Sequence, residues 1–234
     1  VVRELQEHHH RVRCLVHTPG SERLFPDRSV EVHYGSVTDP AALAGSMYDV
    51  EVVIHLVGII RKSRNLTYDL INRQGVANVA AAAKEAGVKH FVQVSAIGAT
   101  NDVNYTYLYS KWKGEQEVIN SGLPYTIIRP SIMFGEGDEF LDTLAGLVKT
   151  TPVVPVAGSG RNRFQPIAVA DMAKCLALAV DREDLKGKTV EIGGPDQLSY
   201  NGLITLISRT LGKRRFRLHV PTWMMYVPTA MIQK

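Results

Sequence analysis

Apolar residues along this 234-residue chain follow two kinds of pattern. Short continuous runs rich in Val, Ile and Leu predict buried β-strands, and longer runs with apolar positions every three to four residues predict helices. The strand pattern is clearest at 50–57, where only Glu51 and His55 interrupt it. The helix pattern is clearest at 68–86, which is rich in Ala and precedes Gly87. An almost continuous apolar strand indicates a sheet covered on both faces, where His55 would be a core histidine with satisfied nitrogens.

The two patterns alternate through the first 134 residues. Strands are predicted at 11–17, 30–34, 50–57, 91–95 and 125–129, and helices at 39–47, 68–86 and 105–120. Strand–helix alternation with short connections predicts βαβ units and an α/β fold with a doubly wound parallel sheet of the Rossmann type. Ligands of such sheets bind at the carboxyl ends of the strands. The residues at those ends are His17, Ser36, Gly58, Ser95 and Ser131.

After Phe134 the pattern changes. The segment 151–163 is rich in Pro, Gly and Val, and it lies among predicted helices at 139–148, 167–180 and 200–211 and a short strand at 189–192. We therefore expect a Rossmann-type core of residues 1–134 and a smaller lobe of residues 135–234, parts of which return to the core.

Composition limits the classes of partner. The formal net charge of +4 suits an anionic ligand and does not indicate DNA binding. Two cysteines far apart in sequence favour reduced thiols over a disulfide or a metal site. We interpret the basic cluster at 213–217 as a solvated loop or strand edge rather than as a recognition patch. The following segment 220–232 contains Trp and Met, and we favour its packing on the second lobe over docking on a membrane or a partner.

The chain begins with Val1, and residues 1–6 already resemble the middle of an amphipathic helix. We therefore expect that the sequence is a fragment lacking residues at both ends. The expected absent parts are the first strand of the sheet and the glycine-rich turn before the first helix.

The sharpest chemical feature is Tyr107 with Lys111, four residues apart and so on one face of a predicted helix. A nearby ammonium is expected to lower the pKa of the phenol and prepare it for proton transfer. Tyr109 and Lys113 repeat the spacing, and an isolated pair of this kind is usually structural. We prefer Tyr107 and Lys111 because Gly-Glu follows them and a strand ending at Ser95 precedes them.

Several ordered motifs carry a family resemblance. They are Gly35–Asp39, His55–Gly58, Asn72–Gly75, Val92–Ala99, the Tyr107/Lys111 pair, Ile128–Ser131 and Phe134–Gly135. In this order they resemble the extended and atypical short-chain dehydrogenase/reductases. The second half narrows the resemblance to the NDUFA9-like group, which contains an accessory subunit of respiratory complex I and its bacterial relatives. The motifs there are Gly135–Phe140, Pro152–Val156, Gly158–Arg161, Phe164–Ile167, Asp171–Ala173 and Gly193–Pro195.

The resemblance implies a nicotinamide dinucleotide as cofactor and assigns residues to it. Lys111 would contact the nicotinamide ribose, and Asn72 would steady the hydrogen bonds at the end of the sheet. The other implied neighbours are Leu56, Val57 and Gly58 for the adenosine side, Ser36 and Val37 for the adenine, and Pro130, Ser131 and Ile132 for the nicotinamide. Tyr107 would be the general acid/base, and Ser95 or Thr100 would stabilise an oxyanion.

The chain also departs from the family pattern. His17 stands where an acidic residue would bind the ribose 2′-hydroxyl, and Ser21 and Arg23 follow it, which favours NADP(H) slightly over NAD(H). Ile97 stands where a Ser or Thr partner of the catalytic tyrosine is often found.

Two functions therefore compete. The first is an NAD(P)(H)-dependent oxidoreductase or epimerase acting on a small carbonyl or hydroxyl substrate whose identity the sequence leaves open. The second is a non-catalytic, nucleotide-binding accessory or assembly protein with respiratory-complex subunits as partners. An RNA- or membrane-associated factor is a weaker third. The expected location is the cytoplasm or the periphery of the inner membrane, on the matrix side in a eukaryote.

Overall fold

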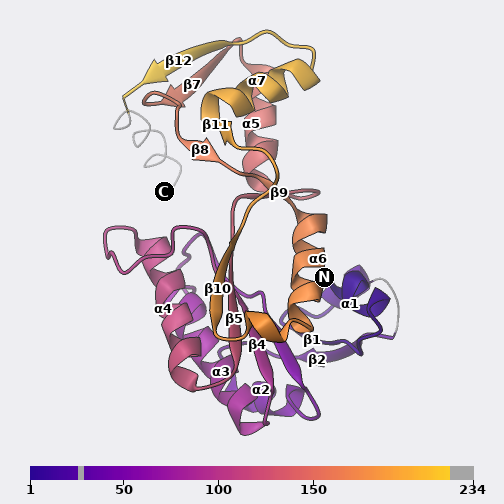
Figure 1. Cartoon of the computed structure of the whole chain (residues 1–234). Helices are drawn as coiled ribbons and strands as arrows, with labels where there is room; N and C mark the ends of the chain where they lie inside the picture. The colour runs from indigo at the N-terminus through magenta and orange to yellow at the C-terminus, as the bar shows by residue number, and fades with distance from the viewer. Residues whose placement is uncertain (26–28, 222–234) are drawn as a thin grey trace. The chain divides into compact units, whose positions relative to one another are not determined.

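A computed structural model of the protein describes residues 1–25 and 29–221 (Figure 1). Most of the segment 220–232 lies outside these residues. The chain divides into two compact units, Val1–Pro130 with Ala170–Ile192, and Ser131–Val169 with Gly193–Lys234. Compared with the expected boundary at residue 134, the first unit ends at Pro130 and regains residues 170–192.

The first unit contains six parallel strands. They are β1 (Arg13–Val16), β2 (Glu31–Tyr34), β3 (Val52–His55), β4 (His90–Val94), β5 (Tyr125–Pro130) and β10 (Lys188–Ile192). Every pairing among them is parallel, with β10-β5-β4-β3 forming one sheet and β1-β2 another. The predicted α/β fold with a Rossmann-type parallel sheet is confirmed. The sheet is in two parts.

Helices cover both faces of these strands. On one face lie α1 (Val2–Glu7) and α6 (Val169–Val180), and on the other lie α2 (Pro40–Ser46), α3 (Val76–Glu85) and α4 (Thr106–Ser121) (Figure 1). Local sequence explains their ends. Asp39 caps α2 by accepting from the backbone N–H groups of Ala41 and Ala42, with Pro40 at the first helical position. Gly122 ends α4 with a φ of 78°.

Two predicted helices differ at their starts. The predicted helix at 68–86 begins with a π-helix at Asp69–Gly75 and becomes α-helical only at α3. The predicted helix at 167–180 begins at Val169, because Ile167 and Ala168 form strand β9. The N–H of Ile167 donates to the carbonyl of Ile132, and β9 pairs with β6 (Met133–Phe134). The spacing of apolar residues alone does not predict such pairing between distant segments.

The core of the first unit forms where α2, α3 and α4 meet the sheet. Its members include Leu43, Val53, Val79, Ala83, Phe91 and Val118. The π-helix packs closely on α4, because a Cβ added at Gly114 would lie 2.3 Å from the carbonyl oxygen of Asn72. This contact brings the helix that carries Tyr107 and Lys111 against the segment that carries Asn72.

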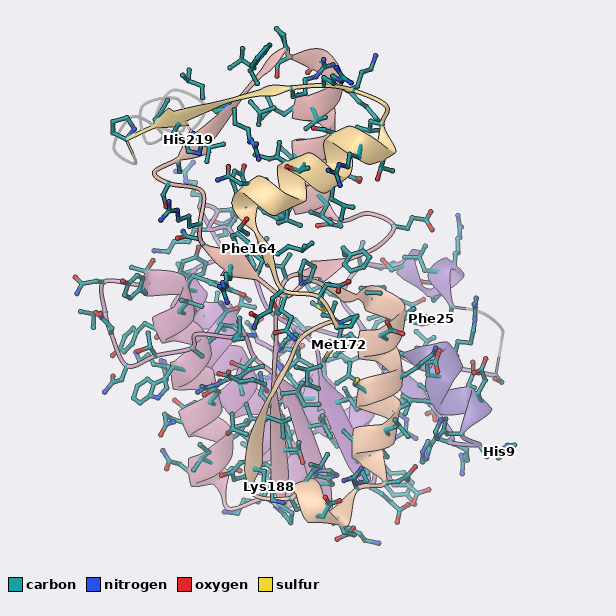
Figure 2. All side chains as sticks on the ribbon, turned by 45° about the horizontal axis from the view of Figure 1, so that its top comes forward. His9, Phe25, Phe164, Met172, Lys188 and His219 are labelled. Atoms are coloured by element: carbon teal, nitrogen blue, oxygen red, sulfur yellow. The ribbon has the colours of Figure 1, made fainter. Side chains whose placement is uncertain are left out.

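The second unit is built on two helices, α5 (Glu139–Thr150) and α7 (Tyr200–Thr210). Its other elements are β7 (Val153–Ala157) paired in parallel with β12 (Phe216–Val220), and β8 (Arg163–Phe164) paired with β11 (Leu198–Ser199). Phe164, on β8, is labelled in Figure 2. Its ring lies 6.2 Å from that of Phe140 and 6.3 Å from that of Tyr200.

The basic cluster is bonded to the second unit itself. Arg215 donates to the carbonyls of Val148 and Lys149, and Arg217 donates to the carbonyl of Asn201. These bonds agree with a strand-edge role for both arginines. Among the described residues, no helix combines the length and apolar character needed to cross a membrane.

Candidate functional site

The candidate site lies at the carboxyl ends of β3 and β4, where they meet the start of α4. Gly58, in the segment after β3, borders it. A Cβ added at Gly58 would lie 3.3 Å from the Lys111 ammonium nitrogen and 3.4 Å from Oδ1 of Asn72. Glycine therefore lets the backbone lie close against a buried cation, and the neighbouring Leu56 and Val57 are exposed.

Asn72 joins three segments at this point. Its Oδ1 accepts from the N–H of Ile59 at 2.8 Å, and its Nδ2 donates to the Ile59 carbonyl at 3.0 Å and to the Ser110 hydroxyl at 3.0 Å. The Ser110 hydroxyl in turn donates to the carbonyl of Tyr107. Asn72 belongs to the π-helix and its side chain is buried. π-Helical turns are often found at functional sites. The segment after β3, the π-helix and α4 are thus held together by one side chain.

Lys111 is 6% exposed, and its Nζ donates to the carbonyl of Val94 at 2.9 Å. Burial lowers the pKa of this ammonium to about 8, and the negative charge of Glu115 works in the opposite direction. Glu115 is itself buried and accepts two hydrogen bonds from Arg129, at 2.9 and 2.7 Å. The sequence analysis missed the ion pair between Glu115 and Arg129. The four-residue spacing between Lys111 and Glu115 did indicate that Glu115 shares a helix face with Lys111.

The expected effect of Lys111 on Tyr107 is wrong in direction. The pKa of Tyr107 is raised, first by burial and then by Tyr68, whose ring lies 5.8 Å away. The Lys111 ammonium donates to the Val94 carbonyl, and burial of the Tyr107 hydroxyl, together with Tyr68, decides the direction of its pKa shift. A phenol is already protonated at neutral pH, and the upward shift of its pKa leaves Tyr107 in the protonated form that a proton donor needs.

The two overlapping Tyr/Lys pairs have different surroundings. The Tyr109 ring stacks on Trp112 at 5.9 Å, and the Lys113 ammonium lies 5.3 Å from the Tyr109 ring and 3.3 Å from a carboxylate oxygen of Asp69. The Lys113 side chain is 35% exposed. This second pair belongs to a surface cluster, whereas Lys111 lies in the interior beside Gly58.

Two of the buried polar side chains that lack hydrogen-bond partners among the described residues follow or end the strands of the candidate site. One is the Ser95 hydroxyl, although the Ser95 N–H donates to the carbonyl of Ile128. The other is His55, both of whose ring nitrogens are unpartnered. His55 packs on Phe91, and burial, aided by the Lys111 charge, lowers its pKa to about 3. His55 is a core histidine, as expected, but the expectation that its ring nitrogens are hydrogen-bonded is wrong. Such atoms are unusual in a folded protein and point to a ligand or water.

The residues expected around the adenine are more dispersed. His17 follows β1 and is exposed, with Nδ1 3.4 Å from the Thr18 hydroxyl. The Ser36 and Thr38 hydroxyls bond to each other at 2.8 Å. The Val37 side chain is packed in the core, and its backbone carbonyl accepts a hydrogen bond from Asn78. The adenine contacts expected for Ser36 and Val37 stay predictions.

The residues expected near the nicotinamide divide between the two units. Pro130 ends β5, and its carbonyl accepts from the N–H of Ile97. Ser131 is buried and, with Ile132, belongs to the second unit. The structure therefore brings Gly58, Asn72 and Lys111 together and connects Asn72 through Ser110 to the backbone of Tyr107. The nicotinamide contacts stay predictions.

The model of the NAD(P)H-binding family matches residues 1–183. The chain belongs to this family. It is 32% identical over 171 residues to NADH dehydrogenase [ubiquinone] 1 alpha subcomplex subunit 9 of Arabidopsis thaliana, covering 72% of this chain and 42% of that protein. It is also 32% identical to ceramide reductase of Caulobacter vibrioides, over 74% of this chain and 54% of that protein. The predicted atypical, NDUFA9-like branch of the short-chain dehydrogenase/reductases is confirmed.

The fold has solved counterparts. UDP-glucuronic acid 4-epimerase from Bacillus cereus, in complex with UDP-glucuronic acid and NAD, superposes with a TM-score of 0.78 at 17% identity, covering 94% of this chain and 81% of that one. This likeness concerns the fold alone. The chain spans only about two fifths of the length of the complex I subunit that it matches.

The lowered pKa of Lys111 makes a prediction about stability. The folded protein releases this proton near pH 8, whereas the unfolded chain holds it to about pH 10.4. Between these values the unfolded chain binds more protons, so the free energy of unfolding should rise with pH, by on the order of 3 kcal/mol in total. Urea unfolding of the wild type and Lys111→Met between pH 7 and 10 measures this contribution. If the free energy of unfolding changes equally with pH in both proteins, folding does not lower the pKa of Lys111.

Proposed function

We propose that the protein is an NAD(P)H-dependent reductase acting on the carbonyl group of a small molecule. The observation that carries this proposal is the close approach of Gly58 to Lys111 and Asn72, with Asn72 joined through the Ser110 hydroxyl to the turn of α4 that carries Tyr107. These residues fit a dinucleotide, because a buried ammonium can donate to ribose hydroxyls and glycine allows close approach. When bound, the cofactor supplies a hydride.

The protein's own residues would position the reactants and move one proton. Asn72 holds the segment after β3 against α4, which keeps Gly58 and Lys111 in register. Tyr107, protonated at neutral pH, donates its phenolic proton to the oxygen of the substrate carbonyl. The unpartnered Ser95 hydroxyl is the candidate donor that orients the same oxygen.

The test is consumption of NADPH with a panel of aldehydes and ketones. It is run on residues 1–234 and on a form with an added N-terminal strand and glycine-rich turn, since that turn holds the pyrophosphate in such folds. Turnover by either form supports the reductase. Tight binding of NADPH without turnover of any carbonyl would instead favour a non-catalytic protein.

We further propose a preference for NADPH. The segment after β1 offers Ser21 and Arg23, and no carboxylate stands at position 17 to bind a ribose 2′-hydroxyl. The nearby Glu22 carboxylate is engaged with the N–H of Gly20 at 2.7 Å. A charge-assisted bond from Arg23 to the 2′-phosphate is worth about 1.5–3 kcal/mol.

Fluorescence titration should therefore give a Kd for NADPH about tenfold below that for NADH, since about 1.4 kcal/mol corresponds to tenfold. Arg23→Gln should remove the difference and leave NADH binding unchanged. Arg3→Gln, on α1, is the matched control. A wild type that binds both dinucleotides equally would contradict the preference.

The alternative is an accessory or assembly protein of a respiratory complex, peripheral to the inner membrane. Two observations favour it, the similarity to a complex I subunit and the presence of Ile97 where a catalytic hydroxyl is often found. Its test is co-purification of the tagged protein with membrane respiratory subunits. Recovery of those subunits by Tyr107→Phe as well as by wild type would support a role that needs no catalysis.

A further inference from the structure

The segment 59–66, after β3, has an unusual composition. It reads Ile-Ile-Arg-Lys-Ser-Arg-Asn-Leu, with three cationic side chains and no carboxylate. Two large apolar side chains are exposed within it, Ile60 at 62% and Leu66 at 44%. Its turn is ordered by two backbone hydrogen bonds between Ser63 and Leu66. An ordered segment that exposes both apolar and cationic groups fits a ligand with both characters.

This segment is physically tied to Tyr107. The Tyr68 hydroxyl donates to the carbonyl of Ile60 at 2.8 Å, and the Lys62 ammonium lies 4.7 Å from the centre of the Tyr68 ring. The same ring lies edge-on to the ring of Tyr107. At its other end, the segment is held by the two hydrogen bonds between Asn72 and Ile59. It is therefore held directly beside the candidate proton donor.

The segment after β4 has a similar surface. Ile97, Val103 and Tyr105 expose 44%, 63% and 60% of their surfaces. This segment also borders α4, since a Cβ at Gly98 would lie 3.6 Å from a methyl group of Leu108, the neighbour of Tyr107. Its single carboxylate, Asp102, accepts from Asn104. Apolar side chains thus stand on both segments that lead to Tyr107, and cations stand on one of them.

We propose that 59–66 is the substrate-recognition segment of this site and that the substrate is an anionic amphiphile. Its apolar chain would carry the reacting carbonyl group and lie on Ile60 and Ile97, while its phosphate or carboxylate would bind Arg61 and Arg64. A polyhydroxylated substrate would instead need polar side chains at these apolar positions. The proposal rests on the proposed reductase for the carbonyl, but not for the binding of the amphiphile.

The first measurement is binding of dodecyl phosphate, below its micelle concentration, by calorimetry. It should bind at least tenfold more tightly than butyl phosphate, because each buried methylene contributes about 0.8 kcal/mol, or about fourfold, when fully buried. Arg61→Gln/Arg64→Gln should weaken it about tenfold. The matched control, Lys89→Gln/Lys188→Gln, removes two cations from the amino ends of β4 and β10 and should have no effect.

The second measurement is kcat/KM with NADPH for alkanals and for ω-oxo carboxylates of equal length. The double arginine variant should lose about tenfold for the carboxylates only, and Ile60→Ser should lose activity with long chains of both kinds. If short neutral aldehydes are reduced as well as long anionic ones, the inference is overturned while the reductase stands. If dodecyl phosphate binds as expected but no carbonyl is reduced, the recognition site stands and the reductase falls.

Two further outcomes would overturn the recognition site. One is binding of dodecyl phosphate that the double arginine variant leaves unchanged. The other is binding to vesicles of anionic lipid with no binding of monomeric dodecyl phosphate, which would make the segment a membrane contact.

Discussion

Replacing Tyr107 with Phe is expected to lower kcat for carbonyl reduction by about 10²–10⁴-fold, the usual contribution of a positioned general acid. The variant keeps the aromatic ring that contacts Tyr68, so the packing of α4 should be unchanged. It removes only the hydroxyl, which is protonated at neutral pH and is the candidate proton donor. The Kd for NADPH should stay within about twofold of wild type, since Lys111, Asn72 and Gly58 remain in place.

Tyr109→Phe is the matched control for this experiment. It lies on the same helix with the same spacing to a lysine, but its ring belongs to the surface cluster with Trp112 and Lys113. Its kcat should equal that of wild type. Full activity in Tyr107→Phe, together with a loss in Tyr109→Phe, would reverse the assignment. Equal activity in all three proteins would exclude both tyrosines as the proton donor.

Replacing Glu115 with Ala should destabilise the protein by about 3 kcal/mol, at the lower end for breaking a buried ion pair. The Glu115 side chain is 2% exposed and forms a bidentate contact with Arg129. Its loss leaves the guanidinium with only Glu191, at 3.7 Å and more exposed. The free energy of unfolding in urea, measured by circular dichroism at pH 7, gives the size of the effect.

The double variant Glu115→Leu/Arg129→Leu separates the pair from its isolated charge. It should be more stable than Glu115→Ala, because no charge is left buried without a partner. A second consequence concerns Lys111, whose pKa Glu115 helps to keep up. In Glu115→Ala the pKa of Lys111 should fall below its wild-type value, which the pH dependence of unfolding would detect. A variant as stable as wild type would show that the contact contributes little.

The local sequence determined the order of the elements. Continuous apolar runs predicted the strands. The helix ends at Asp39-Pro40 and Gly122 are also local, because capping and left-handed turns depend on residues close in sequence. The family motifs likewise identified the dinucleotide-binding class. A glycine allows close approach of the backbone and a lysine can donate to ribose hydroxyls, and both properties belong to the single residue. These features require no knowledge of what packs against them.

Only the tertiary structure decided which side chains work together. Two Tyr/Lys pairs have identical spacing, and burial beside Gly58 distinguishes Lys111 from Lys113. The direction of the Tyr107 pKa shift depended first on burial of its hydroxyl and then on Tyr68, which belongs to another segment. The π-helix at Asp69–Gly75 packs closely on Gly114 of α4, a contact between segments far apart in sequence. Each of these results depends on distances between residues far apart in the chain, because desolvation and hydrogen bonding are set by neighbours in space.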